Sequence, residues 1–241
     1  MSKIHTAMVM AAGHGTRMRH LTQNRAKAMV DLGGRPLIDH MLDRLQSAGI
    51  SRAVVNVHAH ADHLEAHLTS RQTGPEIIIS DEREALLETG GGVVKARPLL
   101  GEDPILICNI DAIWVEFAPV LPALTAAWNP AIMSDLMLLA PRDDCLGFAG
   151  AGDFDRDKTG RVSRRAGEQA AWVYAGVQIF KPLSANGYSC ERFSRTRMWE
   201  PGFGDGTIYG LPLPGYWMHV GDPEARRAAE AVLAIAEGPN L

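Results

Sequence analysis

Short apolar runs alternate with amphipathic segments along the first hundred residues. The apolar runs are bounded by glycine or polar residues, and they predict buried strands at residues 7–11, 53–57, 76–80 and 104–109. Apolar residues spaced three or four apart predict a helix over 36–48, and further helices are expected over 61–68 and from 91 to 100. This alternation is typical of parallel βαβ units with helices on both faces of the sheet. The pattern therefore predicts a doubly wound α/β fold with a mostly parallel sheet.

The pattern is less regular after about residue 112. Residues 134–140 and 172–180 are apolar enough to be strands, and residues 153–165 read as a polar hairpin around Lys158, Thr159 and Gly160. Alanine, glutamate, arginine and leucine dominate residues 223–236, which predicts a closing helix. No internal repeat and no linker rich in proline, glycine or serine interrupts the chain. We therefore expect one domain over residues 1–241.

Composition and charge narrow the class of protein. Twenty-four Lys and Arg against 28 Asp and Glu give a net charge of −4, so no global basic field attracts nucleic acid or a membrane surface. No apolar stretch is long enough to span a membrane, and the first twelve residues lack the layout of a signal peptide. The three cysteines are widely spaced and indicate reduced thiols. The expectation is a cytoplasmic protein with neither a nucleic-acid nor a membrane partner.

The clearest candidate chemistry follows the first predicted strand. Gly13 and Gly15 form a Gly-x-Gly turn whose backbone N–H groups can crowd an anion, and Arg17 and Lys27 add positive charge suited to a polyphosphate. The motif is not a dinucleotide fingerprint, because Met18 stands where the third glycine is required, and no Gly-Lys-Ser/Thr of a P-loop is present. By itself, Gly-x-Gly is more often a tight turn with surface charges.

The wider segment resembles the signature of the sugar-1-phosphate nucleotidyltransferases. Ala26 replaces the proline usual before the lysine, and the segments at 86–96, 105–114 and 215–225 resemble later motifs of the family in the same order. In length and in its Leu-Glu-Thr-Gly-Gly-Gly segment the chain is most similar to the short N-acetylmuramate α-1-phosphate uridylyltransferases, and it has no hexapeptide repeats of a C-terminal β-helix. The positions that match the signature are Gly13, Gly15, Thr16, Arg17, Lys27, Val30, Gly34, Pro36 and Ile38.

The resemblance implies a division of the chain and a nucleotide site. Residues 1–112 would form the nucleotide-binding half, residues 113–222 the sugar-phosphate-binding half, and residues 223–241 a closing helix and tail. Arg17 and Lys27 would be the catalytic residues, stabilising the charge of the triphosphate during in-line attack by the sugar phosphate, without a protein nucleophile. The implied nucleotide-binding residues are Ala12, Gly13, Gly15, Thr16, Arg17, Lys27, Glu88, Thr89, Gly90 and Asn109.

The glycines after Thr89 and the sugar site follow from the same resemblance. Gly90, Gly91 and Gly92 precede a predicted helix, where they would let the backbone approach a flat base or a sugar and the helix N-terminus would favour an anion. Taken alone, such a segment is more often a flexible loop. The implied sugar-binding residues are Gly152, Tyr174 and Gly176.

The implied metal is Mg²⁺, with Asp111 as its ligand. Asp111 follows a predicted strand, so its carboxylate is expected at the carboxyl end of a parallel sheet, where such folds bind ligands. A strand-end aspartate can also be a turn or cap residue. The family's second metal aspartate is replaced by His219, which leaves three alternatives: Asp222 substitutes for it, Asp111 and phosphates hold the metal alone, or the site prefers Mn²⁺ or Co²⁺. The family's sugar-phosphate lysine also lacks a clear match, with Arg164 or Arg165 near its place.

Two other motifs suggest different chemistry. His58, His60, Asp62 and His63 spell His-x-His-x-Asp-His, the zinc signature of metallo-β-lactamase hydrolases, but the downstream histidines of that fold are missing and the segment reads as an ordinary surface helix. Residues 153–157 hint at a calcium loop, yet the sixth position is lysine and the twelfth is arginine, so a hairpin is preferred.

The expected function is transfer of a nucleotide from an NTP to a sugar 1-phosphate, giving a nucleoside diphosphate sugar and pyrophosphate. UTP with N-acetylmuramate α-1-phosphate is preferred. GTP with mannose 1-phosphate, or dTTP or UTP with glucose 1-phosphate, stay open, as does a non-catalytic sensor that binds a nucleotide sugar. The expected partners are the NTP and the sugar 1-phosphate, with the protein a monomer or a small homo-oligomer.

Overall fold

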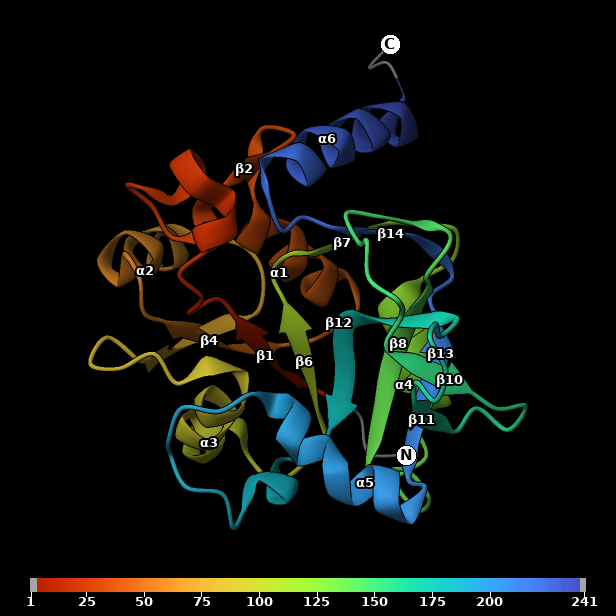
Figure 1. The fold of residues 1–241 in the computed structure, drawn as a ribbon. Helices are drawn as coiled ribbons and strands as arrows, with labels where there is room; N and C mark the ends of the chain where they lie inside the picture. Colours follow the sequence, from red (N-terminus) through yellow and green to blue (C-terminus); the bar gives the residue numbers. More distant parts are fainter. Residues whose placement is uncertain (1–3, 239–241) are drawn as a thin grey trace.

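A nine-stranded mixed sheet lies at the centre of the structure, a computed structural model that describes residues 4–238 (Figure 1). The strands lie in the order β11-β10-β12-β6-β1-β4-β5, with β8 beside β12 and β13 beside β8. Their bounds are β1 (Thr6–Met10), β4 (Arg52–Val57), β5 (Glu76–Asp81), β6 (Ile105–Asn109), β8 (Asp135–Pro141), β10 (Phe154–Arg156), β11 (Val162–Arg164), β12 (Trp172–Phe180) and β13 (Ile208–Pro212).

The first half of this sheet is parallel and covered on both faces. Strand β1 pairs in parallel with β4 and β6, and β4 pairs in parallel with β5. Helices α1 (Leu37–Ser47) and α2 (Ala61–Ser70) lie on one face and α3 (Glu88–Leu100) on the other (Figure 1). Successive strand residues point to opposite faces, so Ala7 and Val9 join the core under α1 and α2 while Met8 joins the core under α3. The predicted doubly wound α/β fold is confirmed.

The second half of the sheet is mainly antiparallel. Strand β12 runs antiparallel to both β6 and β8, and β10 and β11 form the hairpin expected at residues 153–165. The pairing of β12 with β8 shifts register between Tyr174 and Gln178, and Gly176 inside this irregular stretch has φ +83°. Only glycine adopts this conformation readily.

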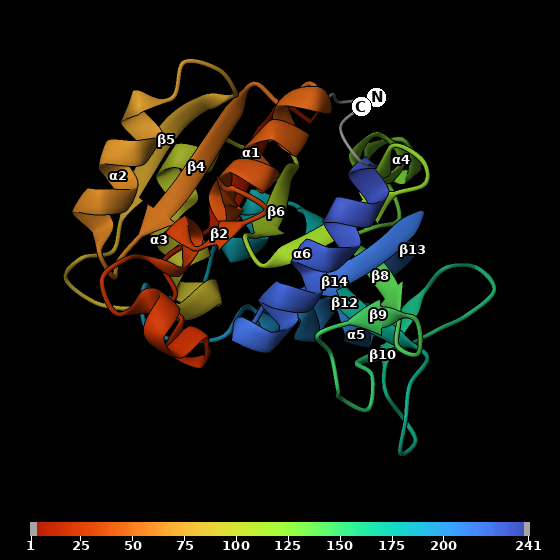
Figure 2. The same cartoon turned by 90° about the horizontal axis from the view of Figure 1, so that it is seen from above.

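The structure also contains a second sheet, of three strands, which the hydrophobic pattern did not predict. It contains β7 (Ala112–Glu116), β14 (Gly215–His219) and β9 (Cys145–Leu146), with β14 antiparallel to β7. The closing helix α6 (Pro223–Glu237) contacts β2 (Asp31–Leu32) of the first half and β9 and β14 of the second (Figure 2). The shorter elements are β3 (Arg35–Pro36), α4 (Val120–Ala127), α5 (Glu200–Asp205) and the 3₁₀ segments η1 (Thr16–Thr22), η2 (Lys27–Met29), η3 (Pro182–Ala185) and η4 (Arg195–Trp199). Across residues 4–238, no helix has the length and apolar character needed to cross a membrane.

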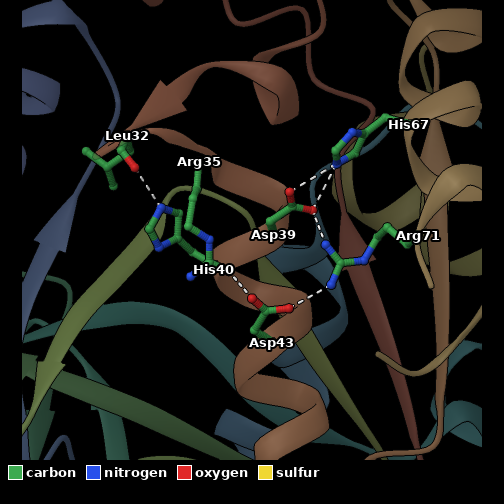
Figure 3. A network of polar contacts seen from close by, with 7 residues as sticks. All are labelled: Leu32, Arg35, Asp39, His40, Asp43, His67 and Arg71. Carbon is green, nitrogen blue, oxygen red and sulfur yellow. Dashed lines mark hydrogen bonds and ion pairs between the residues drawn. The ribbon is translucent and has the colours of Figure 1, made fainter. Parts of the chain in front are cut away.

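Charged side chains connect α1 to α2 (Figure 3). The buried carboxylate of Asp39 on α1 lies 2.9 Å from Nε2 of His67 on α2 and also accepts from Arg71. Arg71 reaches the next turn of α1 as well, donating to Asp43 at 2.7 Å. Because Asp39 is largely withdrawn from water, its charge requires these partners. His67 therefore serves helix packing, in agreement with the structural reading of the histidine-rich segment.

A second buried polar group lies at the start of β8. Asp135 is 4% exposed, accepts from Nε2 of Gln178 at 2.6 Å, and Gln178 in turn accepts from the indole N–H of Trp199. Burial raises the pKa of Asp135 to about 6, against the opposing effects of Ser134, Arg195 and Lys181. The carboxyl is therefore protonated more readily in the folded chain than in the unfolded chain.

We expect Asp135→Asn to change how stability depends on pH. Between the ordinary pKa of 3.8 and about 6 the folded state binds a proton that the unfolded state has lost, so the Asp135 contribution to stability declines as pH rises through this window. The difference corresponds to roughly 3 kcal/mol. The free energy of unfolding of Asp135→Asn relative to the unsubstituted protein should therefore increase by that order between pH 4 and pH 7 in urea titrations. Asp103→Asn, in an exposed loop, is the control, and a difference that does not vary with pH would contradict the assignment.

Candidate functional site

A pocket of about 390 Å³ lies where β1 and β6 end. The parallel register sets Met10 beside Asn109, so the turn after β1 and the loop after β6 meet at one edge of the sheet. Open α/β sheets bind ligands at this edge. The pocket brings together seven of the expected site residues: Ala12, Gly13, Lys27, Glu88, Thr89, Asn109 and Asp111.

The Gly-x-Gly turn supports the lysine side chain. Gly15 has φ +65°, and a Cβ at this position would lie 2.8 Å from Cβ of Lys27. A side chain at residue 15 would therefore displace Lys27 as well as strain the backbone. Ala26, in place of the family's proline, keeps a proline-like extended conformation at φ −60° and ψ 149°. Thr16 and Arg17 follow on η1 and are exposed outside the pocket lining.

Lys27, Asp111 and His219 converge at the floor of the site. Nζ of Lys27 lies 2.6 Å from Oδ2 of Asp111, and Nε2 of His219 lies 3.3 Å from the same oxygen. Burial opposes ionisation of Asp111, but the neighbouring Lys27 and His219 outweigh it and hold the pKa of this carboxyl below its usual range. The site therefore presents a carboxylate ion-paired with a lysine ammonium.

His219 reaches Asp111 through strand pairing. Residue 219 pairs with Ala112 in the β7–β14 ladder, and the N–H of Val220 donates to the backbone carbonyl of Asp111 at 2.9 Å. The other ring nitrogen of His219, Nδ1, lies 3.3 Å from the carbonyl oxygen of Gly147, which can only accept. When a cation binds beside Asp111, Nε2 must be unprotonated, and the Gly147 carbonyl then holds the remaining proton on Nδ1, the usual arrangement of a metal-binding histidine.

These donors fit a divalent cation that also binds substrate. One carboxylate oxygen and one imidazole nitrogen converge, and no group of three or more His, Cys, Asp or Glu in the described part of the chain could form a complete protein cage. Mg²⁺ in nucleotide sites is commonly held by one or two carboxylates plus phosphate oxygens, while imidazole favours softer ions. Asp222, considered in the sequence as a replacement ligand, instead caps α6: its Oδ1 accepts from the N–H groups of Glu224 and Ala225, both at 2.9 Å. The cap gives Asp222 a structural role that accounts for its position before α6.

The glycine triplet has a packing role that differs from our expectation. Helix α3 begins at Glu88, so Gly90, Gly91 and Gly92 lie inside its first turns and not in a loop before it. A Cβ on Gly90 would lie 2.4 Å from the ring of Phe193, and one on Gly91 would lie 2.0 Å from the backbone oxygen of Glu191. The three residues are buried behind the pocket, whereas Glu88 and Thr89 line it. The absence of side chains allows residues 191–193 to pack against α3.

A second pocket, of about 440 Å³, lies farther along the same sheet. Gly152 and Tyr174, two of the expected sugar-binding residues, line it together with Arg164 and Arg165. Gly152 has φ +83°, and a Cβ there would lie 2.2 Å from the carbonyl oxygen of Ala170. The third expected residue, Gly176, is buried under the first pocket instead, with its missing side chain leaving room for Asn109 and Ala112.

Arg195 lies between the two pockets and was not expected from the sequence. It is 3% exposed, its Nη2 donates to the hydroxyl of Tyr174 at 2.7 Å, and its Nε and Nη1 are buried without a partner among the described residues. Burial raises the pKa of Tyr174 to about 12, although Arg195 opposes this effect. Its neighbours Ser194 and Thr196 line the first and the second pocket respectively. Nothing in the sequence around this single arginine indicates that its side chain is buried between two pockets.

Asn56 and Glu82 were also missed. Asn56 lines the first pocket, and Glu82 lies behind it with no exposed surface. A polar residue near the end of a buried strand was the available signal for Asn56. The nearby histidine motif does not form a metal site among the described residues. Nδ1 of His58 lies 2.7 Å from the backbone oxygen of Glu82, and no described group of three potential ligands forms there.

Comparison with known proteins agrees with this geometry. Residues 6–131 match the family model described as nucleotidyl transferase. The chain is 50% identical over 236 residues to an N-acetylmuramate alpha-1-phosphate uridylyltransferase of Caulobacter vibrioides, covering 95% of this chain and 97% of the relative. A protein of the same description from Neisseria meningitidis is 29% identical over 229 residues, covering 94% and 97%.

Solved structures support the fold. A UTP-bound UGPase from Acinetobacter baumannii has a TM-score of 0.81 at 16% identity, covering 99% of this chain and 96% of that one. An inositol-1-phosphate CTP transferase from T. maritima has a TM-score of 0.78 at 18% identity, covering 99% and 98%. Together with the match of the family model and the 50% identical relative, the site geometry leads to one conclusion. The chain belongs to the nucleotidyl transferase family, among the sugar-1-phosphate nucleotidyltransferases.

Proposed function

We propose that the protein joins UTP to N-acetylmuramate α-1-phosphate, giving UDP-N-acetylmuramate and pyrophosphate. The observation that carries the proposal is the pocket with Lys27 and Asp111 on its floor, next to a second pocket lined by two arginines. The name of the 50% identical relative supports the choice of both substrates. Residues 1–112 supply most of the first pocket and residues 113–222 the second pocket, which supports their assignment to nucleotide and sugar phosphate.

The roles follow from position and charge. The backbone N–H group of Gly13 is available to the phosphates, Ala12 lines the same wall with its N–H on Asn56, and Glu88, Thr89 and Asn109 bind the nucleoside. Lys27 leaves Asp111 for the triphosphate, and Arg17, exposed on η1, adds a second positive charge. The anionic oxygen of the sugar phosphate attacks the α-phosphorus while the bond to pyrophosphate breaks. Because no proton needs to be removed from this oxygen, the side chains act by positioning and charge stabilisation.

Asp111 and His219 would hold the divalent cation. When bound, such a cation neutralises charge on the phosphate oxygens that develops during transfer. Asp111 presents an ionised carboxylate at any working pH, and the Gly147 carbonyl orients the imidazole of His219. The mixed donor set supports Mn²⁺ or Co²⁺ as alternatives to Mg²⁺.

The arginines of the second pocket support an acidic sugar. Arg164 pairs with Glu200, whereas Arg165 donates to the backbone oxygen of Glu168 at 3.1 Å and has no carboxylate partner within residues 4–238. N-acetylmuramate carries a carboxylate on its lactyl ether, which mannose and glucose lack. A free guanidinium beside the sugar site is suited to bind this group.

The function is tested by pyrophosphate release with four NTPs and several sugar 1-phosphates, each with Mg²⁺, Mn²⁺ and Co²⁺. Release with UTP and N-acetylmuramate α-1-phosphate is the expected result. Release with another pair, such as GTP and mannose 1-phosphate, would show that the proposed substrates are wrong and that the type of reaction is right. Binding of a nucleotide sugar without any release would favour the sensor function instead.

We expect Arg165→Gln to affect only the acidic sugar. Its kcat/KM should fall roughly tenfold with N-acetylmuramate α-1-phosphate and stay unchanged with N-acetylglucosamine 1-phosphate, which lacks the lactyl ether and its carboxylate. Lys158→Gln, on the same hairpin, is the matched control. Equal losses with both sugars would show that Arg165 does not read the carboxylate.

A further inference from the structure

A buried carboxyl group lies behind the first pocket and does not touch it. Glu82, immediately after β5, has no exposed surface. Its Oε1 accepts from Nδ2 of Asn56 at 2.8 Å, while Oε2 is buried without a partner among the described residues. A buried carboxyl group with an unsatisfied oxygen is costly, so its presence requires a reason other than stability.

Asn56 connects this carboxyl to the turn after β1. Its Oδ1 accepts from the backbone N–H of Ala11 at 2.7 Å and of Ala12 at 3.3 Å. Ala11, Ala12 and Asn56 all line the pocket. The Asn56 amide must present oxygen, not nitrogen, to these two donors, and an acceptor on its other side fixes that orientation. The Glu82 carboxyl is that acceptor.

The same carboxyl also contacts the other wall of the pocket. The backbone N–H of Leu87, directly before Glu88 and Thr89, is close enough to lower the pKa of Glu82. Gly92 on α3 leaves room for the Glu82 carboxyl group, because a Cβ there would lie 2.7 Å from Oε1 of Glu82. One side chain thus joins the loop after β1 to the start of α3.

Burying the Glu82 carboxyl group costs free energy, because the group loses its contact with water. Burial raises the pKa of Glu82, while Asn56, Leu87, Lys95 and His58 act in the opposite direction. Replacing the carboxyl by an apolar side chain of similar length removes this desolvation but leaves the buried Nδ2 of Asn56 without an acceptor. A loss of stability must therefore be measured separately from a loss of positioning.

We propose that Glu82 is a positioning residue for nucleotide binding, acting through the Asn56 amide on the backbone N–H groups of Ala11 and Ala12. That the bound ligand is a nucleotide rests on the function proposed above. The link from Glu82 to the loop rests on the three hydrogen bonds alone.

The experiment compares Glu82→Met with Glu82→Gln. Methionine removes the acceptor, whereas glutamine keeps an amide oxygen for Asn56 and adds no charge. We expect Glu82→Met to raise the KM for UTP roughly tenfold with a smaller change in kcat, and Glu82→Gln to stay within about twofold of the unsubstituted protein. Glu84→Met, exposed two residues away, is the matched control.

Hydrogen exchange of the ligand-free protein gives a second readout. The Ala11 and Ala12 amides should exchange faster in Glu82→Met than in Glu82→Gln, by more than any difference between the free energies of unfolding of the two variants explains. This readout needs no substrate, so it tests the proposal even if UTP is not the nucleotide. No turnover of the unsubstituted protein with any NTP would instead overturn the proposed function.

Unchanged exchange and unchanged KM in Glu82→Met would overturn the positioning role. So would a Glu82→Gln variant as impaired as Glu82→Met. If Glu82→Met does not fold, Asn56→Ala removes the acceptor of the two N–H groups directly, and an unchanged KM for UTP in that variant would overturn the proposal.

Discussion

Asp111→Asn is expected to abolish nearly all turnover, by at least roughly a thousandfold, while the protein still folds. The change keeps the size of the side chain and removes the only carboxylate on the pocket floor that contacts both Lys27 and His219 among the described residues. Lys27, 11% exposed, loses its counter-charge, so the free energy of unfolding should fall by about 1–3 kcal/mol. The measurements are pyrophosphate release with each metal and urea unfolding.

The control for Asp111→Asn is Asp81→Asn. Asp81 ends the parallel strand β5 on the same edge of the sheet, but it is exposed and pairs with Arg83. A surface pair of this kind contributes little, so activity should stay within about twofold. If Asp111→Asn kept more than a tenth of the original turnover, the central role of this carboxylate would be wrong.

Lys27→Ala is expected to lower turnover roughly a hundredfold or more, the scale found when one group that stabilises the transition state is removed. Lys27→Arg should recover only part of the loss, because the planar guanidinium cannot replace a compact ammonium in the space left by Gly15. Steady-state kinetics of both variants test this, with Lys158→Ala in the exposed hairpin as the control.

The pH dependence of Lys27→Ala gives an independent check. Without Lys27, burial of Asp111 is opposed by fewer charges, so the pKa of Asp111 should rise. The acid side of the residual activity profile should then move to higher pH, because a protonated carboxyl cannot hold a cation. An unmoved profile would indicate that Lys27 does not control the ionisation of Asp111.

The fold of the first half was predictable because its signals are local. Each strand–helix unit buries its own apolar face, so the pattern of residues 36–48 was sufficient to locate α1 within a residue of its ends. The glycine triplet shows the limit of such reasoning. Flexible loops and tightly packed helices both use glycine, and only the presence of residues 191–193 against α3 separates the two.

The site could be predicted in part. Strand-end position located Asp111, and the resemblance located Lys27, both of which line the pocket. Asn56, Glu82 and Arg195 were missed because isolated polar residues in a sequence give no sign of burial or of the partners they will contact. For Asp222 the sequence left open a role as a ligand, because a carboxylate before a helix can serve as a cap or as a ligand; in the structure its Oδ1 caps α6.

The sequence by itself determined the doubly wound architecture, the glycine turn and the identity of the charged residues that chemistry requires. Only the tertiary structure decided which of them meet. His219 approaches Asp111 because β14 pairs with β7, and Arg195 enters the core because η4 packs against α3. These contacts join residues far apart in the chain, and they depend on strand register and on burial of whole elements. Local patterns of hydrophobicity indicate which face of an element is buried, but not which distant element covers it.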